Sequence, residues 1–156
     1  MVWQQKNQTV YKKSNGIKDT KFIPNKIATN YTKRLLDSKD AAERQILGQK
    51  LLNEISQSLA ISTPRLTVHD KRQNHSLKNG KLMRKTYGTY KTGNITINNK
   101  TAVRQTVVAS KTFLDTLIHE FMHHYDYEIL KLSTSLHTAG FYYRLGDMMK
   151  KLTKGI

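Results

Sequence analysis

Two histidines and a glutamate lie in the C-terminal part of the chain at a spacing that suits a metal site. His119, Glu120 and His123 form the pattern HExxH within the stretch LIHEFMHHYD. Positions i and i+4 of a helix lie about 40° apart around its axis and one turn along it, so both imidazoles can reach one ion. A glutamate beside such an ion is placed to act as a general base. The spacing predicts a divalent metal site that carries its own base.

The helix that carries this pattern is predicted to have a core face and a site face. At about 100° per residue, its large apolar residues between Leu114 and Leu132 fall opposite the two histidines. The histidine face also holds Asp126 and Tyr127. This separation argues against a chance match in a charged surface helix, and a structural or inactive metal site is the alternative.

A zinc ion in an active site needs a third protein ligand and keeps a fourth position for water. His124 and Glu128 point about 140° and 180° away from His119, so they are turned from the ion. Asp126 lies on the right face but one turn further along, where a carboxylate suits the orientation of a ligand imidazole. His137 follows a break at STSL and can fold back, so we expect it to be the third ligand. In the alternative, His137 is a helix N-terminal residue without a metal role.

Before this site, the chain is predicted to form an extension and then a helical region. Residues 1–28 carry scattered Lys, Asn and Gln and few apolar residues, so a basic extension that is flexible or loosely docked is expected. From about Tyr31 to Leu59, apolar residues recur at mostly helical spacing, which predicts one long helix or two short ones. Ser38 or Asp40 is a candidate cap for a break between them.

After Pro64 the sequence changes to short runs rich in Thr, Val, Ile and Tyr. The runs RLTVHD, YGTYKTGNITINN and RQTVVAS predict the strands of a small sheet, and the basic stretch KRQNHSLKNGKLMRK between the first two predicts a loop or hairpin.

Two helices are expected after the strands. The first should begin near Ser110 or Thr112, where Thr112 and Asp115 fit a capping pattern, and continue to about Leu132. The last should run from about His137 to Leu152. The order of helix, small sheet, helix and helix predicts an α+β fold.

Composition and charge bound the class of protein and its partners. The 156 residues suit one domain, and no apolar run approaches the ~20 residues that span a bilayer, so a cytoplasmic protein without a membrane partner is expected. Without cysteine, His, Asp or Glu must hold any metal. The net charge is +16; residues 62–112 carry 11 Lys and Arg against one Asp, and residues 1–28 carry six against one. This charge predicts a nucleic-acid partner, with a basic but inert surface as the alternative.

The stretch LIHEFMHHYD, a preceding strand such as NITINN and the following HTAGF together resemble the SprT-like (Spartan-type) zinc metalloprotease domain. The resemblance covers about residues 30–155 and is strongest from Tyr87 to Leu145. In the family the last His is followed by Gly, whereas Thr138 stands here and Gly140 comes two residues later. Many relatives carry a Cys-rich zinc ribbon, which this cysteine-free chain cannot supply. The resemblance implies a metallopeptidase domain at residues 29–156.

The implied fold is a zincin-like minimal metalloprotease. It would contain an N-terminal helix, a small three- to four-stranded sheet, the HExxH helix and a C-terminal helix that carries the third ligand. His119, His123 and His137 would hold one Zn²⁺ per chain, and Glu120 would be the catalytic base in the hydrolysis of peptide bonds.

Other site residues follow from the same resemblance. A strand that borders the cleft would accept an extended substrate, and its groove would be lined by Asn94, Ile95, Thr96, Ile97 and Asn98. Tyr127, Tyr142 and Tyr143 are weak candidates for stabilising the oxyanion, with ordinary packing as the favoured role for each.

The family's link to DNA leads to three hypotheses about function. DNA commonly recruits SprT-like proteases to DNA-bound or crosslinked proteins, and the basic 62–112 region and N-terminal tail fit such a nucleoid-associated role. Alternatively, the chain is a nucleic-acid-binding module with a structural or inactive zinc site, or a regulatory peptidase of a mobile element that cleaves one partner. Substrate and oligomeric state stay open.

Overall fold

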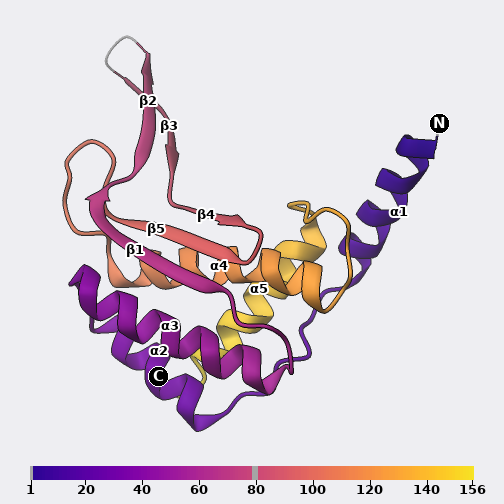
Figure 1. The fold of residues 1–156 in the computed structure, drawn as a ribbon, viewed down its shortest axis with the longest axis horizontal. Helices are drawn as coiled ribbons and strands as arrows, with labels where there is room; N and C mark the ends of the chain where they lie inside the picture. Colours follow the sequence, from indigo (N-terminus) through magenta and orange to yellow (C-terminus); the bar gives the residue numbers. More distant parts are fainter. Residues whose placement is uncertain (1, 79–80) are drawn as a thin grey trace.

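The computed structural model describes residues 2–78 and 81–156, which form an α+β fold of helices around a small sheet (Figure 1). Met1, Asn79 and Gly80, which belong to the predicted extension and the predicted loop or hairpin, lie outside the described residues. The helices are α1 (Val2–Gly16), α2 (Lys26–Leu36), α3 (Ala41–Ser58), α4 (Ser110–Glu128) and α5 (Ala139–Leu152). The strands are β1 (Arg65–Arg72), β2 (Asn74–Lys78), β3 (Lys81–Thr86), β4 (Gly88–Lys91) and β5 (Asn94–Lys100).

The main sheet has the strand order β1–β5–β4, with β5 parallel to β1 and antiparallel to β4. Thr92 and Gly93, with φ values of 47° and 78°, form the two-residue turn between β4 and β5. Two positive φ values suit the turn type that matches the twist of a hairpin. β2 and β3 form a separate antiparallel hairpin, which confirms the hairpin alternative and projects away from the helices (Figure 1).

One edge of the main sheet is covered by side chains of α3. The N–H groups of Leu66 and Val68 in β1 donate to the side-chain oxygens of Gln49 and Gln45, at 2.8 and 2.7 Å. The amide groups of the same two glutamines donate back to the carbonyls of Pro64 and Leu66. Because these bonds occupy backbone groups that a further strand would use, the first half of β1 is a closed edge.

The helices around the sheet bury one apolar core, which positions α4. The region after residue 25 forms two helices, α2 and α3, which is one of the two predicted alternatives. Asp40 caps α3 by accepting a hydrogen bond from the N–H of Glu43. α4 contacts β4 and β5 on one side and α5 on the other. The core residues from these elements include Leu47, Leu51 and Ile55 of α3, Ile95 and Ile97 of β5, Leu114, Leu117 and Phe121 of α4, and Phe141 and Met148 of α5.

The run RQTVVAS was predicted to be a strand and is a loop, apart from one bridge between Lys100 and Val107. A buried guanidinium holds this loop in place, because Arg44 donates to the carbonyl of Val108 and to the side chain of Asn99, each at 2.7 Å. A β-rich composition could not reveal this contact, which comes from a residue in α3.

The boundaries of the last two helices differ from the sequence prediction. α4 ends at Glu128, and it begins after Ala109, which makes no side-chain capping bond. The predicted capping pair Thr112 and Asp115 does not cap it; Asp115 instead pairs with Lys111 at 3.2 Å. α5 starts after Thr138, whose hydroxyl accepts from the N–H of Phe141. The expectation that the third histidine lies on the last helix is therefore wrong, since it lies in the preceding loop.

The N-terminal residues form helix α1 and a segment that docks onto the rest of the chain. Ser14, Thr20 and Phe22 are buried, and Lys13 donates to the carbonyl of Leu130 at 2.6 Å. The prediction of a flexible or loosely docked extension did not include this helix or these contacts. The division of the chain at residue 28 stays a prediction. None of the helices among the described residues is long and apolar enough to cross a membrane.

Candidate metal centre

Three histidine side chains converge in front of α4. His119 and His123 come from α4, and His137 comes from the loop just before α5. Nε2 of His137 lies 3.2 Å from Nε2 of His119 and 3.0 Å from Nε2 of His123. One ligand atom from each residue lies within 4.8 Å of the other two. The structure thus brings together the three predicted ligands.

The spacing of these nitrogens fits a metal site. Zinc binds imidazole at about 2.0–2.1 Å in tetrahedral geometry, which places two ligand nitrogens about 3.4 Å apart. The two distances of 3.2 and 3.0 Å come close to this separation. Three imidazole nitrogens at this separation can be shared by one cation, so the donor set fits a divalent cation that prefers imidazole. It does not distinguish zinc from other such ions.

Burial keeps two of the histidines in the neutral form that binds metal. Burial lowers the pKa of His119, and the neighbouring His137 lowers it further. Burial lowers the pKa of His123 to about 4, with added repulsion from His119 and His137. The ring of Phe141, which is fully buried, lies 4.8–5.1 Å from all three imidazoles and forms an apolar floor beneath them.

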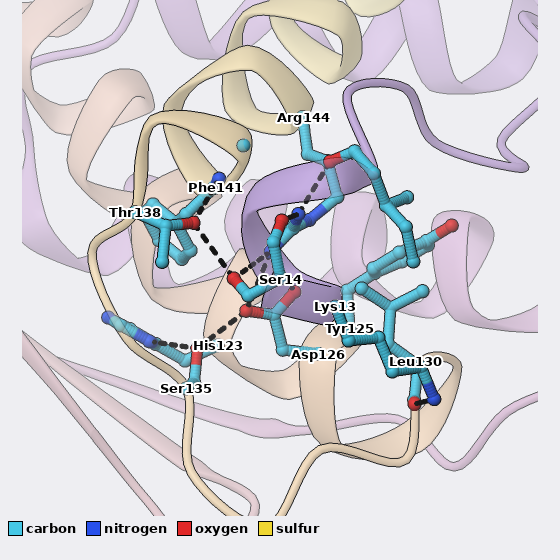
Figure 2. A network of polar contacts seen from close by, with 12 residues as sticks. Lys13, Ser14, His123, Tyr125, Asp126, Leu130, Ser135, Thr138, Phe141 and Arg144 are labelled. Carbon is cyan, nitrogen blue, oxygen red and sulfur yellow. Dashed lines mark hydrogen bonds and ion pairs between the residues drawn. The ribbon is translucent and has the colours of Figure 1, made fainter. Parts of the chain in front are cut away.

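A serine and an aspartate fix the tautomer of His123. The hydroxyl of Ser135 donates to Asp126 at 2.7 Å, so it has no second proton to give (Figure 2). Nδ1 of His123 lies 2.7 Å from the same hydroxyl oxygen, and it must therefore be the donor. With the proton on Nδ1, the lone pair of Nε2 points to the other histidines. Asp126 thus contacts His123 through Ser135, which the sequence did not single out, and the predicted role of Asp126 in orienting a metal ligand stays a prediction.

Asp126 is itself held by a buried cation. Nη2 of Arg144 lies 3.0 Å from one oxygen of Asp126, and both side chains are fully buried. Burial raises the pKa of Asp126 above its usual value, and the Ser135 hydroxyl and the Arg144 guanidinium limit the rise. The guanidinium contacts both oxygens of Asp126, which favours the carboxylate form that accepts from Ser135.

Glu120 lines a cleft of about 560 Å³ together with His119 and His137. The side chain is 8% exposed, and burial raises its pKa to about 7. The positive charge of a divalent ion nearby would oppose this shift. The opposite wall is β4: a Cβ on Gly88 would lie 3.4 Å from Cγ of Glu120 and 2.8 Å from Cγ2 of Thr116. The other lining residues are Tyr87, Thr112, Asp115, His119, His137, Leu145 and Met149.

The predicted substrate groove at Asn94, Ile95, Thr96, Ile97 and Asn98 needs a correction. These residues form β5, which is the central strand and is paired with β1 on one side and β4 on the other. Both hydrogen-bonding edges are occupied, so a substrate strand cannot add there. The strand that borders the cleft and lies at the edge of the sheet is β4.

The remaining predicted residues of α4 have other contacts. His124 and Glu128 are turned from the histidine cluster: His124 donates from Nε2 to the carbonyl of Ser62 and accepts from the hydroxyl of Tyr90, and Glu128 accepts from Ser62. Tyr127 stacks on Tyr90.

Of the three candidate oxyanion tyrosines, Tyr142 alone lies beside the ligands. Its ring centroid is 5.8 Å from that of His137 and 6.3 Å from that of His119. The hydroxyl of Tyr127 accepts from the N–H of Ser135, and the ring of Tyr143 lies under the ammonium of Lys18.

Comparisons with known proteins leave the family open. No protein-family model matches the chain, and no curated protein and no solved structure matches it.

Proposed function

We propose that this protein is a zinc-dependent metallopeptidase of the SprT-like, zincin-like type, with one zinc ion per chain. One observation carries the proposal: the two HExxH histidines and a third histidine from a distant loop converge, and two of the three, His119 and His137, line one cleft with the buried Glu120 beside an edge strand. A structural metal site has no need of a buried carboxylate at such a cleft.

Each residue of the centre has a role in this chemistry. His119, His123 and His137 would hold the ion, and a bound zinc ion polarises a carbonyl group and lowers the pKa of water. Glu120 takes the proton of the attacking water and passes it to the amine that leaves. Ser135 and Asp126 keep His123 in the ligand tautomer.

The open edge of β4 provides a place for an extended peptide. Lys91 and Asn94 flank the two-residue turn and form a hydrogen-bonded pair, and such pairs alternate along an antiparallel ladder. The N–H and C=O groups of Gly88 and Tyr90 therefore point away from β5. A substrate strand that pairs with these groups would lie in the cleft, beside Glu120.

The experiment that tests this function compares two variants, Glu120→Gln and Glu128→Gln, which change residues of the same helix. We expect Glu120→Gln to lower the hydrolysis of a protein such as casein by about 10²–10⁴-fold, because the base is lost, with zinc content unchanged. Glu128 is turned from the centre, so its variant should behave as wild type. Equal activity of wild type and Glu120→Gln would disprove the proposed mechanism. A wild type that binds zinc and shows no hydrolysis would favour the structural site.

Nucleic-acid binding is a second proposed function, favoured by the β2–β3 hairpin. The sequence of residues 71–86 contains six Lys and Arg and no Asp or Glu. Lys71 and Arg72 at the end of β1 and Lys78 in β2 are exposed, and the β2–β3 hairpin projects from the body of the protein (Figure 1). A projecting basic arm can follow a phosphate backbone without blocking the cleft.

Salt dependence tests this second function. DNA affinity should fall steeply as salt rises, and Lys71→Glu with Lys78→Glu should weaken binding and flatten the slope. Lys50→Glu is the matched control, because Lys50 is exposed on α3, away from the hairpin. Affinity that does not change with salt would exclude a nucleic-acid partner.

A further inference from the structure

The end of α1 is inserted next to the residues that support the candidate metal centre. We propose that residues 13–17, here the N-terminal strap, are a positioning element of this centre, so that docking of the strap and metal binding strengthen each other. This inference rests on the proposed metal site. It concerns residues that lie more than a hundred positions before the histidines in the sequence.

The first connection runs from the strap to His137. The hydroxyl oxygens of Ser14 and Thr138 lie 2.9 Å apart and share a hydrogen bond, and both residues are buried (Figure 2). Thr138 follows His137 directly and caps α5 through the N–H of Phe141. Ser14 therefore helps to fix the backbone next to a ligand and the start of the helix that carries the apolar floor.

The second connection runs from the strap to His123 through Arg144. The guanidinium donates to the carbonyls of Ser14 and Ile17 at the C-terminal end of α1, where helix carbonyls lack intrahelical partners. These two bonds come from Nη1. The second terminal nitrogen, Nη2, lies 3.1 Å from the hydroxyl oxygen of Ser14 and 3.0 Å from a carboxylate oxygen of Asp126. Asp126 then reaches His123 through Ser135. One buried cation thus binds the strap and the support of a ligand together (Figure 2).

A glycine in α5 permits this close approach. A Cβ on Gly140 would lie 2.2 Å from the carbonyl oxygen of Ser14 and 2.8 Å from backbone atoms of Asn15. The N–H of Gly140 also donates to the side chain of Asn15 at 3.2 Å. Because the obstructing atoms are backbone, a methyl group at this position must displace the strap from α5.

Linkage makes the coupling reciprocal. If the docked strap favours the arrangement that binds metal, metal must favour the docked strap by the same factor. Contacts that orient metal ligands commonly change metal affinity about 10–100-fold when they are removed. A strap that only adds stability to the fold would change the midpoint of unfolding and leave the affinity of the folded protein for zinc as it is.

The test compares Gly140→Ala with Gly146→Ala in the full chain. Gly146 lies on the same helix with no atom within 4 Å of a Cβ, so its variant controls for the substitution itself. We expect Gly140→Ala to lower zinc affinity by about 10–100-fold, measured by competition with a chelator, and Gly146→Ala to bind as wild type. Ser14→Ala, which removes the shared hydroxyl without added volume, serves if Gly140→Ala does not fold, and should also weaken zinc binding.

Hydrogen exchange provides the second readout. In wild type, zinc should slow exchange of the amides of residues 13–17, and Gly140→Ala should exchange faster there without metal. Wild-type zinc affinity in both variants would overturn the proposal, and so would unchanged exchange of the strap in Gly140→Ala. These outcomes leave the peptidase function standing. A wild type that binds no zinc would overturn the metal site itself.

Discussion

The two edges of the main sheet differ in what their backbone groups meet. At the β1 edge, Gln45 and Gln49 of α3 occupy the N–H and C=O groups that face outward. At the β4 edge, the described residues include no further strand, and the outer side of Gly88 opens onto the cleft with Glu120. An uncovered edge is a hazard that proteins usually avoid. The open edge beside the three histidines is therefore the feature on which the proposed pairing with a peptide depends.

Gly88→Ala should have the largest effect, because it changes the open edge. A Cβ there would lie 2.8 Å from Thr116 and 3.2 Å from the carbonyl oxygen of Thr96, so β4 must move away from α4. A misplacement of about 1 Å can cost about 10²-fold in rate, and we expect a loss of that order in peptide hydrolysis. Stability should fall by about 1–3 kcal/mol. Kinetics and urea unfolding measure the two effects.

Thr89→Ala is the control for this change. Thr89 is exposed on the same strand, and its backbone pairs with β5. If Gly88→Ala hydrolyses substrate as fast as Thr89→Ala does, the open edge has no part in catalysis.

The double variant Gln45→Ala and Gln49→Ala uncovers the closed edge. It removes three hydrogen bonds to β1 and one to Pro64, and should lower the free energy of unfolding by about 2–4 kcal/mol, since water can replace part of each bond. Activity and zinc content should not change, because these glutamines do not line the cleft. Urea unfolding beside Gln57→Ala, an exposed glutamine on the same helix, is the measurement. A loss of activity in the folded double variant would remove the functional difference between the edges.

Tyr90→Phe should have the smallest effect. Its hydroxyl lies 2.9 Å from Nδ1 of His124 and links β4 to α4, while its ring stacks on Tyr127. Loss of the hydroxyl should cost about 0.5–1.5 kcal/mol, because the stacked ring remains. Thermal unfolding and kcat/KM test this expectation. A large drop in kcat/KM would assign the hydroxyl a role that its bond to His124 does not explain.

The sequence predicted the parts of the site that depend on local spacing. HExxH needs only a helix, and His137 was chosen because His124 and Glu128 point away from His119 and Asp126 lies one turn too far along. Strand order is different, because β5 lies between β1 and β4 through pairing that no local pattern encodes. The groove was therefore placed on the wrong strand.

The sequence also did not indicate which residues contact and orient the three histidines. Ser135 stands in STS and looks like a turn residue, although its hydroxyl decides the tautomer of His123. Arg144 meets Ser14 across 130 residues of chain, and only the fold brings them together. Because the N-terminal residues are basic and include few apolar side chains, their composition did not predict α1, whose end packs against α5.

Zinc content most directly tests the central claim that three histidines form one metal centre. Wild type, His137→Ala and His69→Ala would be purified in parallel, with His69, an exposed histidine on β1, as the control. We predict one zinc ion per chain in wild type and His69→Ala, and a large loss of zinc in a folded His137→Ala. Equal stoichiometry and affinity in all three proteins would show that His137 is not a ligand and would contradict this account of the site.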